Sequence, residues 1–402
     1  MRLIIKYSLV LILAFLQSCI EPFDPKVVDD NQSLLVVDGI ITNQPGPYVI
    51  KITNSTSLTG DPVAISVSNI FIEDSDGNVE SLTEMSTGVY QTSTLRGETG
   101  QSYRLNFELN GELCQSTWEQ IKESSMIDGI DYQVESKETS DSDIDLVGIQ
   151  FFIDNSGTTL APNYFRFEQY ETWETSVVHR PEFNYLGSDQ IEAIAESLPS
   201  TCWKYKKSKD VNLATTEGLI MNELSSHKLG YMLGNDGEER FTVLYSLLVK
   251  QYTIDENEYL YWKNVKESND EIGGLFDKQP AQVFGNITNL SNPRNDILGY
   301  FSASGLKENR IFVEPGQVRD PSFALTCQPL RSVYKSEFEM ASEYEAALTL
   351  LLSGKSYYFD NFIYLNEGKE NESILGVILV RDACVDCTRK GGNTTKPEFW
   401  NE

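Results

Sequence analysis

Cys19 is the residue whose setting most clearly specifies a chemical modification. It follows an eighteen-residue leader with a basic start, an apolar run over 9–16 and a small residue, Ser18, at its end. These three features are typical of a secretory signal peptide. A cysteine directly after the cleavage point is the residue that carries the acyl chains of a bacterial lipoprotein. We therefore interpret residues 1–18 as a lipoprotein signal peptide and Cys19 as the lipidation site.

The lipid is expected to be the only link to the membrane. The apolar run of the leader is shorter than the roughly twenty residues that a spanning helix needs, and no later run is as long as that. Several acyl chains anchor a protein more firmly than one chain does. Residues 19–33, which are rich in proline and acidic residues, are predicted to be a lipid-anchored linker. The alternative is an ordinary cleaved signal followed by an incidental cysteine.

Five further cysteines could form disulfides outside the cytosol. They are Cys114, Cys202, Cys327, Cys384 and Cys387. An odd number leaves at least one thiol unpaired, and Cys114, on an apparent strand far from the others, is the expected free thiol. The other four are disulfide candidates with three possible connectivities.

Cys384 and Cys387 also form a CxxC pair. A redox CxxC should begin a helix in a thioredoxin-like unit, whereas this pair follows the strand-like run 373–380. A zinc site would require a second clear CxxC. A structural role is therefore favoured.

The residue types that carry common catalytic chemistry are sparse. The two histidines, His179 and His227, are isolated, and the chain has no GxSxG elbow, phosphate-binding loop or dinucleotide fingerprint. Sixty acidic residues make any particular carboxylate pair uninformative, although glycosidases need only two. We assign no catalytic residue, no cofactor and no resident metal.

Asp74 and Asp76 could begin a calcium loop, because the segment 74–78 reads DSDGN. The twelfth position of such a loop should be glutamate, but here it is Met85. Aspartate and glycine are also preferred in hairpin turns. A turn is predicted, and calcium binding stays open.

Residues 34–122 have the pattern of a small β-sandwich. Alternating apolar and polar residues over 102–109 lead to Asn110-Gly111 and then to a second alternating run. Asn-Gly between two such runs is a strong hairpin signal. Several short strands within about ninety residues fit a sandwich.

Residues 123–402 are predicted to form a larger β-rich domain with a few inserted helices. The expected strands cover 147–153, 163–173 and 240–252, and the expected helices cover 188–197, 256–268 and 342–352. Thr253 is the predicted N-cap of the second helix, with Glu256 at its third position. The aromatic residues of 164–173, together with Trp203 and Tyr205, are expected to lie mainly in the core. The fold class is thus mainly β.

Net charge excludes several partners. A formal charge of −28 is incompatible with tracking a nucleic-acid backbone, which requires clustered basic residues. It also disfavours contact with anionic lipid head groups. A cationic ligand or a basic partner surface would be attracted.

Six segments together resemble a known family. They are LLVVDGIITNQPGPYVIKIT at 34–53, GVYQT at 88–92, YSLLVKQY at 245–252 leading to Tyr261-Trp262, GGLFDKQPAQVFGNITN at 273–289, ILGYFSASG at 297–305 and CVDCTRKGGNTTKPEFW at 384–400. The chain is similar to the domain-of-unknown-function family four-two-four-nine, outer-membrane lipoproteins of Bacteroidota. The resemblance implies an N-terminal immunoglobulin- or transthyretin-like sandwich. Members are often encoded beside TonB-dependent receptors, which implies a lipoprotein attached to such a transporter. The family offers no catalytic residues to transfer.

These observations lead to three hypotheses. The first is a non-enzymatic, surface-facing outer-membrane lipoprotein that serves a TonB-dependent, SusC-like transporter in cargo binding or complex assembly. Its cargo could be a small molecule, a glycan or a peptide. The second is a surface hydrolase of glycan or peptide, which requires carboxylates with raised pKa values in one cleft. The third is an assembly or adhesion factor with a docking face of at least about 1,000 Å².

Overall fold

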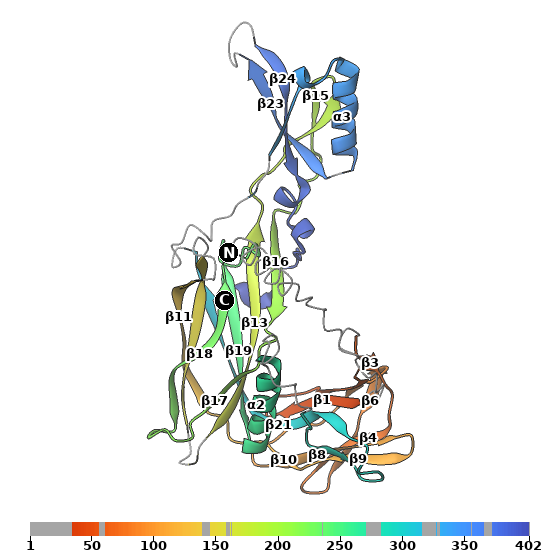
Figure 1. Cartoon of the computed structure of the whole chain (residues 1–402), viewed down its shortest axis with the longest axis vertical. Coiled ribbons are helices and arrows are strands. Elements are labelled where there is room, and N and C mark those ends of the chain that lie inside the picture. Colours follow the sequence, from red (N-terminus) through yellow and green to blue (C-terminus); the bar gives the residue numbers. More distant parts are fainter. Residues whose placement is uncertain are drawn as a thin grey trace, which may run out of the picture.

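The computed structural model describes residues 34–55, 61–138, 145–157, 161, 163–234, 236–270, 283–315, 327, 330–354, 356–365 and 372–401. The predicted signal peptide, Cys19 and the linker to residue 33 lie outside the described residues. The described chain is mainly β, as predicted. It forms three units along a bent body: an N-terminal sandwich, a central sandwich and a distal unit (Figure 1).

The N-terminal sandwich packs two sheets around one apolar core. Its first sheet contains β1 (Leu35–Thr42), β2 (Val49–Asn54), β3 (Val63–Ala64), β6 (Thr83–Ser86) and β7 (Val89–Gln91). Its second sheet contains β4 (Ser68–Asp74), β5 (Val79–Ser81), β8 (Ser102–Leu109), β9 (Glu112–Ser116), β10 (Glu119–Gln120) and β20 (Ile287–Asn289). The core includes Val37, Ile50 and Phe107, which are fully buried.

The Asn110-Gly111 hairpin is confirmed. Asn110 and Gly111 connect β8 to β9 with φ angles of 53° and 83°. Both central residues of this turn type have positive φ, which explains the Asn-Gly sequence.

The predicted domain boundary at residue 122 requires correction. Strand β20 pairs with β9, and the first half of β21 (Ile297–Val313) pairs with β1 in parallel. Ile287, Ile297 and Phe301 belong to the N-terminal core. Residues 34–122 alone would therefore leave this core open on one side, and segments far along the chain complete it.

Strand β21 joins the two sandwiches. Its residues 297–304 pair with β1, and its residues 305–313 pair with β19 (Tyr245–Ile254) in antiparallel register. One half therefore belongs to each sandwich, with the change of partner between Ser304 and Gly305.

The central sandwich contains a strand in each of the three expected segments, although β19 begins at Tyr245 and not at residue 240. One sheet contains β11 (Met126–Glu138), β12 (Asp145–Ser156) and β18 (Glu223–Leu233). The other contains β13 (Tyr164–Ser176), β16 (Thr201–Lys207), β17 (Asn212–Thr215), β19 and the second half of β21. Phe165, Phe167 and Trp173 are buried in its core, as predicted, whereas Tyr205 is 53% exposed.

Helix α2 (Glu256–Asp270) lies where a helix was expected, but its cap differs. Asp255 accepts a hydrogen bond from the Glu258 backbone N–H at 2.8 Å. Thr253 is instead a residue of β19, so the prediction that it caps the helix is wrong. The strand continues two residues further than the sequence pattern indicated, and Asp255 is the first residue free to cap.

The distal unit combines one helix with short strands. Its elements are β14 (Phe183–Gly187), β15 (Gln190–Ala193), β22 (Arg331–Tyr334), the 3₁₀ helix η2 (Lys335–Glu337), α3 (Ala341–Ser353), β23 (Tyr357–Leu365) and β24 (Ser373–Arg381). Helix α3 confirms the predicted helix over 342–352.

The predicted helix over 188–197 is wrong, because that segment completes the β14–β15 hairpin. Gly187, Ser188 and Asp189 all have positive φ, which ends one strand and reverses the chain. The Tyr185 ring stacks on Phe359 at 5.9 Å between centroids. Packing against the distal sheet therefore overrides the local helical pattern.

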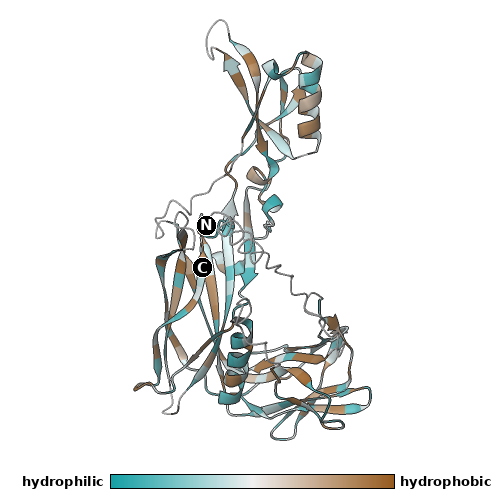
Figure 2. Cartoon of the chain, in the orientation of Figure 1, coloured by the Kyte–Doolittle hydropathy of each residue, from teal (hydrophilic) through white to brown (hydrophobic). Residues whose placement is uncertain are grey.

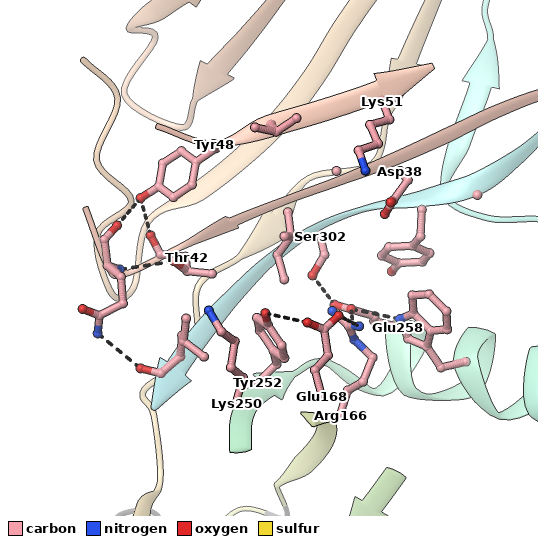
Figure 3. A pocket seen from close by; sticks show the side chains of 18 of the residues that line it. Asp38, Thr42, Tyr48, Lys51, Arg166, Glu168, Lys250, Tyr252, Glu258 and Ser302 are labelled. Atoms are coloured by element: carbon pink, nitrogen blue, oxygen red, sulfur yellow. Dashed lines mark hydrogen bonds and ion pairs between the residues drawn. The ribbon is translucent and has the colours of Figure 1, made fainter. Parts of the chain in front are cut away.

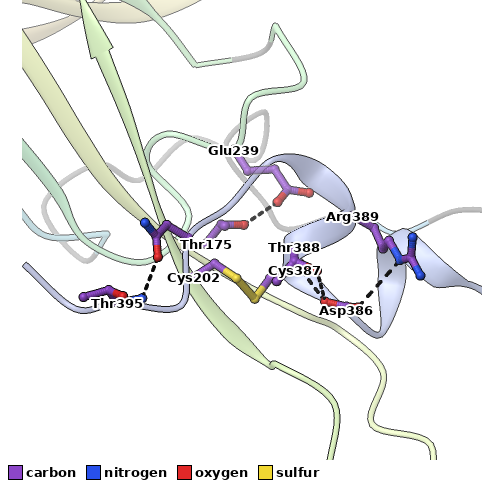
Figure 4. The surroundings of a disulfide bond; sticks show 9 residues. Thr175, Cys202, Glu239, Asp386, Cys387, Thr388, Arg389 and Thr395 are labelled. Atoms are coloured by element: carbon purple, nitrogen blue, oxygen red, sulfur yellow. Dashed lines mark hydrogen bonds and ion pairs between the residues drawn. A yellow bond between two sulfur atoms is a disulfide. The ribbon is translucent and has the colours of Figure 1, made fainter.

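Two disulfides hold the neck between the central sandwich and the distal unit. Cys202 pairs with Cys387, and Cys327 pairs with Cys384, with Cα–Cα distances of 5.7 and 5.8 Å. The CxxC cysteines therefore bind two different partners, as a structural role requires. Asp386 lies beside the first disulfide and accepts hydrogen bonds from Thr388 (Figure 4). Cys114 is buried and free, as predicted.

The last elements of the chain are short 3₁₀ helices. They are η3 (Asp382–Cys384), η4 (Cys387–Lys390) and η5 (Glu398–Asn401). Trp400 of η5 packs on Phe312 of β21 at 5.6 Å, which returns the chain end to the central sandwich.

Hydrophobic and more hydrophilic positions alternate along many of the strands, while α2 is mostly hydrophilic (Figure 2). Within the described part of the chain, no helix combines the length and the apolar character needed to cross a membrane.

The junction at β21 can be tested with two glycines that share one backbone conformation. Gly299 has φ +88°, and a Cβ there would collide with the Val37 carbonyl of β1, whereas Gly100 has φ +90° and open space around it. We expect Gly100→Ala to cost about 1–2 kcal/mol from backbone strain alone. Gly299→Ala should cost about 1–3 kcal/mol more, because overpacking adds to that strain. Urea unfolding measures both free energies, and equal losses would contradict the crowded β1–β21 contact.

Candidate functional site

A cleft of about 770 Å³, here called the corner cleft, lies where the N-terminal and central sandwiches meet (Figure 3). Its floor is the outer face of β1 and β2. On β1, Leu35 and Val37 point into the N-terminal core, so the alternate residues Val36 and Asp38 face the cleft. Asp38 stands opposite Lys51 of β2 in the strand register, and both side chains are exposed. The floor therefore presents a solvent-accessible pair of opposite charges.

The facing wall is built by the same alternation on β13 and β19. Phe165 and Phe167 point into the central core, whereas Arg166, Glu168 and Tyr170 line the corner cleft. Lys250 and Tyr252 of β19 stand beside them. The wall thus carries charged and aromatic groups on one face of β13, whereas Phe165, Phe167 and Trp173 on its other face pack in the central core.

Helix α2 and β21 close the corner. Glu258, Tyr261 and Trp262 come from the helix, and Tyr300 and Ser302 come from β21. The Tyr261 ring packs on Tyr300 at 5.0 Å. The N-terminal sandwich, the central sandwich and helix α2 therefore all contribute side chains to one site.

Arg166 is the centre of the site. Its Nη1 lies 2.9 Å from Glu168 Oε1, and its Nε lies 3.8 Å from Glu258 Oε1. Its guanidinium also lies over the rings of Tyr252 and Trp262, at 4.6 and 4.9 Å from the ring centroids. A planar cation between two rings and two carboxylates fits arginine better than lysine.

Glu168 is held ionised by its donors. Lys207 Nζ lies 3.0 Å from Oε1, while the hydroxyls of Tyr170 and Tyr252 donate to Oε2 at 2.8 and 3.3 Å. Burial alone would raise the pKa of Glu168, but Arg166 and Lys207 outweigh it and hold the pKa at about 2.

Glu258 has the opposite shift. Its side chain is only 2% exposed, and burial raises its pKa above the usual range. The charge of Arg166 opposes that rise, as do hydrogen bonds from Ser302 Oγ at 2.6 Å and Trp262 Nε1 at 3.2 Å. One cleft therefore contains two carboxylates whose environments move their pKa values apart.

Glu119 is a third buried carboxyl group behind the corner. It accepts hydrogen bonds from Asn286 at 2.8 Å and from the Tyr300 hydroxyl at 3.4 Å. Burial raises its pKa to about 7, with further repulsion from Asp255 and Glu258 and opposition from its hydrogen bonds. This group titrates near neutral pH within the β21 junction.

Tyr170, one of the aromatic residues expected in the core, lines this cleft instead, whereas the described candidate site residues singled out from the sequence do not meet there. The four disulfide cysteines lie in the neck, and Cys19 lies outside the described residues. His179 lies 3.4 Å from Asp360, and the His227 ring contacts Asn212 at 3.3 Å. Neither histidine lines the corner cleft.

Asp74 stabilises a hairpin turn between β4 and β5. Its Oδ1 accepts the backbone N–H groups of Asp76 and Asn78 at 3.0 and 2.8 Å. Burial opposes the shift, but these hydrogen bonds lower the pKa of Asp74. Among the described residues, no group of three or more His, Cys, Asp or Glu side chains is arranged to hold a metal ion.

The sequence did not single out Arg166, Glu168 or Glu258. The sequence did contain a signal for Arg166 and Glu168. They alternate with Phe165 and Phe167 along one strand, so the two charged side chains must lie on the face opposite the core. No local pattern could identify Glu258 as buried, since its environment comes from β13 and β21.

A comparison with family models places most of the chain in one match. The model described as Domain of unknown function (DUF4249) matches residues 20–310. The match covers both sandwiches and the corner cleft. No curated protein matches the chain.

The elevated pKa of Glu119 predicts a pH-dependent stability. Between pH 4.5 and about 7 the folded state keeps a proton that the unfolded state has released, so stability should fall as the pH rises through this range. Glu119→Gln should remove this contribution, which is on the order of 2–3 kcal/mol. Urea unfolding from pH 5 to 8 measures it, with the exposed Glu123→Gln as control. If Glu119→Gln kept the wild-type pH profile, the assignment would be wrong.

Proposed function

This chain belongs to the family described as Domain of unknown function (DUF4249), and from that premise we propose a function for it. It is a surface lipoprotein of the outer membrane, anchored through Cys19, that serves a TonB-dependent, SusC-like transporter as a non-enzymatic subunit. The observation that carries this proposal is the shared strand β21, which fixes an open cleft relative to the sandwich nearest the anchor. An accessory subunit needs such a fixed geometry to present cargo to a transporter.

The length of the linker supports a location close to the membrane. Residues 20–33 separate Cys19 from Leu34, where the described residues begin. These fourteen residues span at most about 50 Å when extended. A tether of this reach keeps the N-terminal sandwich near a barrel in the same membrane. Tethering raises the concentration of this protein around the transporter, so the two proteins do not need a high intrinsic affinity for each other.

The character of the corner cleft supports binding rather than catalysis. The carboxylate of Glu168 already accepts four donors, and Glu258 accepts two hydrogen bonds besides its contact with Arg166. These groups are fixed by partners on several strands, which favours a rigid recognition surface.

The distal unit offers a second surface for complex assembly. Several of its large apolar side chains are exposed, including Leu186 at 58%, Met340 at 58% and Leu350 at 77%. Large exposed apolar side chains of this kind are available for contact with a protein partner. The proposed subunit could therefore contact its transporter away from the cleft.

The anchor and the complex can be tested together in cells. Wild-type protein should incorporate labelled palmitate, fractionate with the outer membrane and co-purify with a TonB-dependent β-barrel in mild detergent. Cys19→Ala should lose the label and the membrane fraction, whereas Cys114→Ala should keep both, because Cys114 is a buried core thiol. Recovery of the wild-type protein alone, without a barrel, would count against the transporter role.

A second candidate function rests on one specific observation. Glu258 and Glu168 share the corner cleft with pKa values displaced in opposite directions. Such a pair can supply a general acid and an ionised partner in a glycan or peptide hydrolase. Arg166 between them makes this the weaker candidate, because a substrate would have to displace an existing ion pair.

The hydrolase candidate makes a distinct prediction. If it were correct, purified protein would release products from neutral oligosaccharides or peptides, and Glu258→Gln would reduce the rate at least a hundredfold. Under the accessory role we expect no turnover by either protein above a buffer blank, as measured by chromatography of reducing ends and free amines. Glu256→Gln, at an exposed carboxylate of the same helix that does not line the cleft, is the matched control.

A further inference from the structure

The corner cleft differs from the rest of the molecule in its charge balance. Its acidic lining residues are Asp38, Glu168, Glu258 and Glu308, and its basic lining residues are Lys51, Arg166, Lys207 and Lys250. Equal numbers of the two signs meet in a chain whose formal charge is −28. The cleft therefore presents no excess charge to complement a charged ligand.

Each of these charges also has a neighbour of the opposite sign. Lys250 Nζ lies 2.7 Å from Glu308 Oε1, Lys207 lies 3.0 Å from Glu168, and Asp38 faces Lys51 across the β1–β2 pair. Each pair offers a donor beside an acceptor. Neutral hydroxyl groups can use both without leaving a charge uncompensated, which would be costly in a confined site.

Aromatic rings line the same space. Tyr170, Tyr261 and Trp262 are partly exposed in the cleft, with Tyr252 and Tyr300 more deeply buried behind them. Ring faces pack well against flat apolar surfaces, and their polar tips still form hydrogen bonds. A ligand that suits this lining has apolar faces together with many neutral hydroxyl groups.

The strand pairing disfavours an extended peptide as this ligand. Strand β1 lies between β2 and β21, and β13 lies between β19 and the strands β16 and β17. The backbone groups of the floor and the wall are therefore already hydrogen-bonded on both sides. A peptide that binds by strand addition requires a free edge, which these strands do not provide.

We propose that the corner cleft binds a segment of a neutral oligosaccharide. Tyr170, Tyr261 and Trp262 stack on sugar rings, while the Asp38–Lys51 and Glu308–Lys250 pairs bind hydroxyl groups. The volume of about 770 Å³ is within the range of about 300–1,000 Å³ that ligand sites occupy. The inference rests on the proposed function only in giving the cleft a cargo-binding role.

The test uses detergent-solubilised full-length lipoprotein and defined probes. Neutral probes are maltoheptaose, cellohexaose, xylohexaose and mannohexaose, and the comparison probes are hexagalacturonate and an alanine-rich heptapeptide. Binding is measured by isothermal titration calorimetry. We expect at least one neutral probe to bind and both comparison probes to fail.

Variants locate the site. Trp262→Ala and Tyr170→Ala should each weaken binding of that probe at least tenfold. Asp38→Asn and Lys51→Gln change exposed side chains of the floor, so the fold is retained, and they should weaken binding about three- to tenfold. Trp118→Ala and Tyr205→Ala remove aromatic residues that are 43% and 53% exposed outside the cleft, and binding should stay unchanged.

Three results would overturn the inference. They are failure of every neutral probe to bind, preferential binding of the polyuronate or the peptide, and wild-type affinity in both Trp262→Ala and Asp38→Asn. The transporter role is judged separately by co-purification of a barrel. Sugar binding without a barrel would refute that role alone, and a barrel complex without sugar binding would refute the oligosaccharide site alone.

Discussion

Strand β21 carries two different pairings in succession, and the arrangement of both sandwiches depends on it. Its first half pairs with β1 in parallel, and its second half pairs with β19 in antiparallel register. The two sandwiches therefore share a continuous hydrogen-bonded strand instead of a flexible linker. Gly299 allows the parallel pairing, because any side chain there would meet the β1 backbone. The angle between the sandwiches, and with it the corner cleft, follows from this shared strand (Figure 1).

Buried charges reinforce the same junction at a cost. Arg166, Glu168 and Glu258 are withdrawn from water and are tolerated because each has several partners. Replacing such a network by apolar residues is often neutral or stabilising in proteins. We infer that it is retained because it fixes the geometry of the cleft, which apolar packing would specify less tightly. The result is a polar site with balanced charge inside a strongly acidic molecule.

The distal unit is attached to the central sandwich by disulfides and not by a shared strand. The β14–β15 hairpin is inserted between β13 and β16, and the chain returns to the neck through β24. Disulfides Cys202–Cys387 and Cys327–Cys384 fasten this crossing of distant segments. Such cross-links restrict the unfolded chain and stabilise the native connection. The neck is thus held covalently, whereas the corner is held by strand pairing and charge.

Short sequence patterns predicted those elements whose stability depends mainly on residues close together in the chain. Asn110-Gly111 specified its hairpin, and the segment 342–352 was recognised as the helix that forms α3. The odd number of cysteines, together with the sequence distance of Cys114 from the others, identified Cys114 as the free thiol. The segment 188–197 failed as a helix because a distant sheet supplied its packing partner. The sequence could not reveal that β20 and β21 complete the N-terminal sandwich, or that Glu258 is buried beside Arg166. Those features depend on contacts between residues far apart in the chain, and only the tertiary structure brings these residues together.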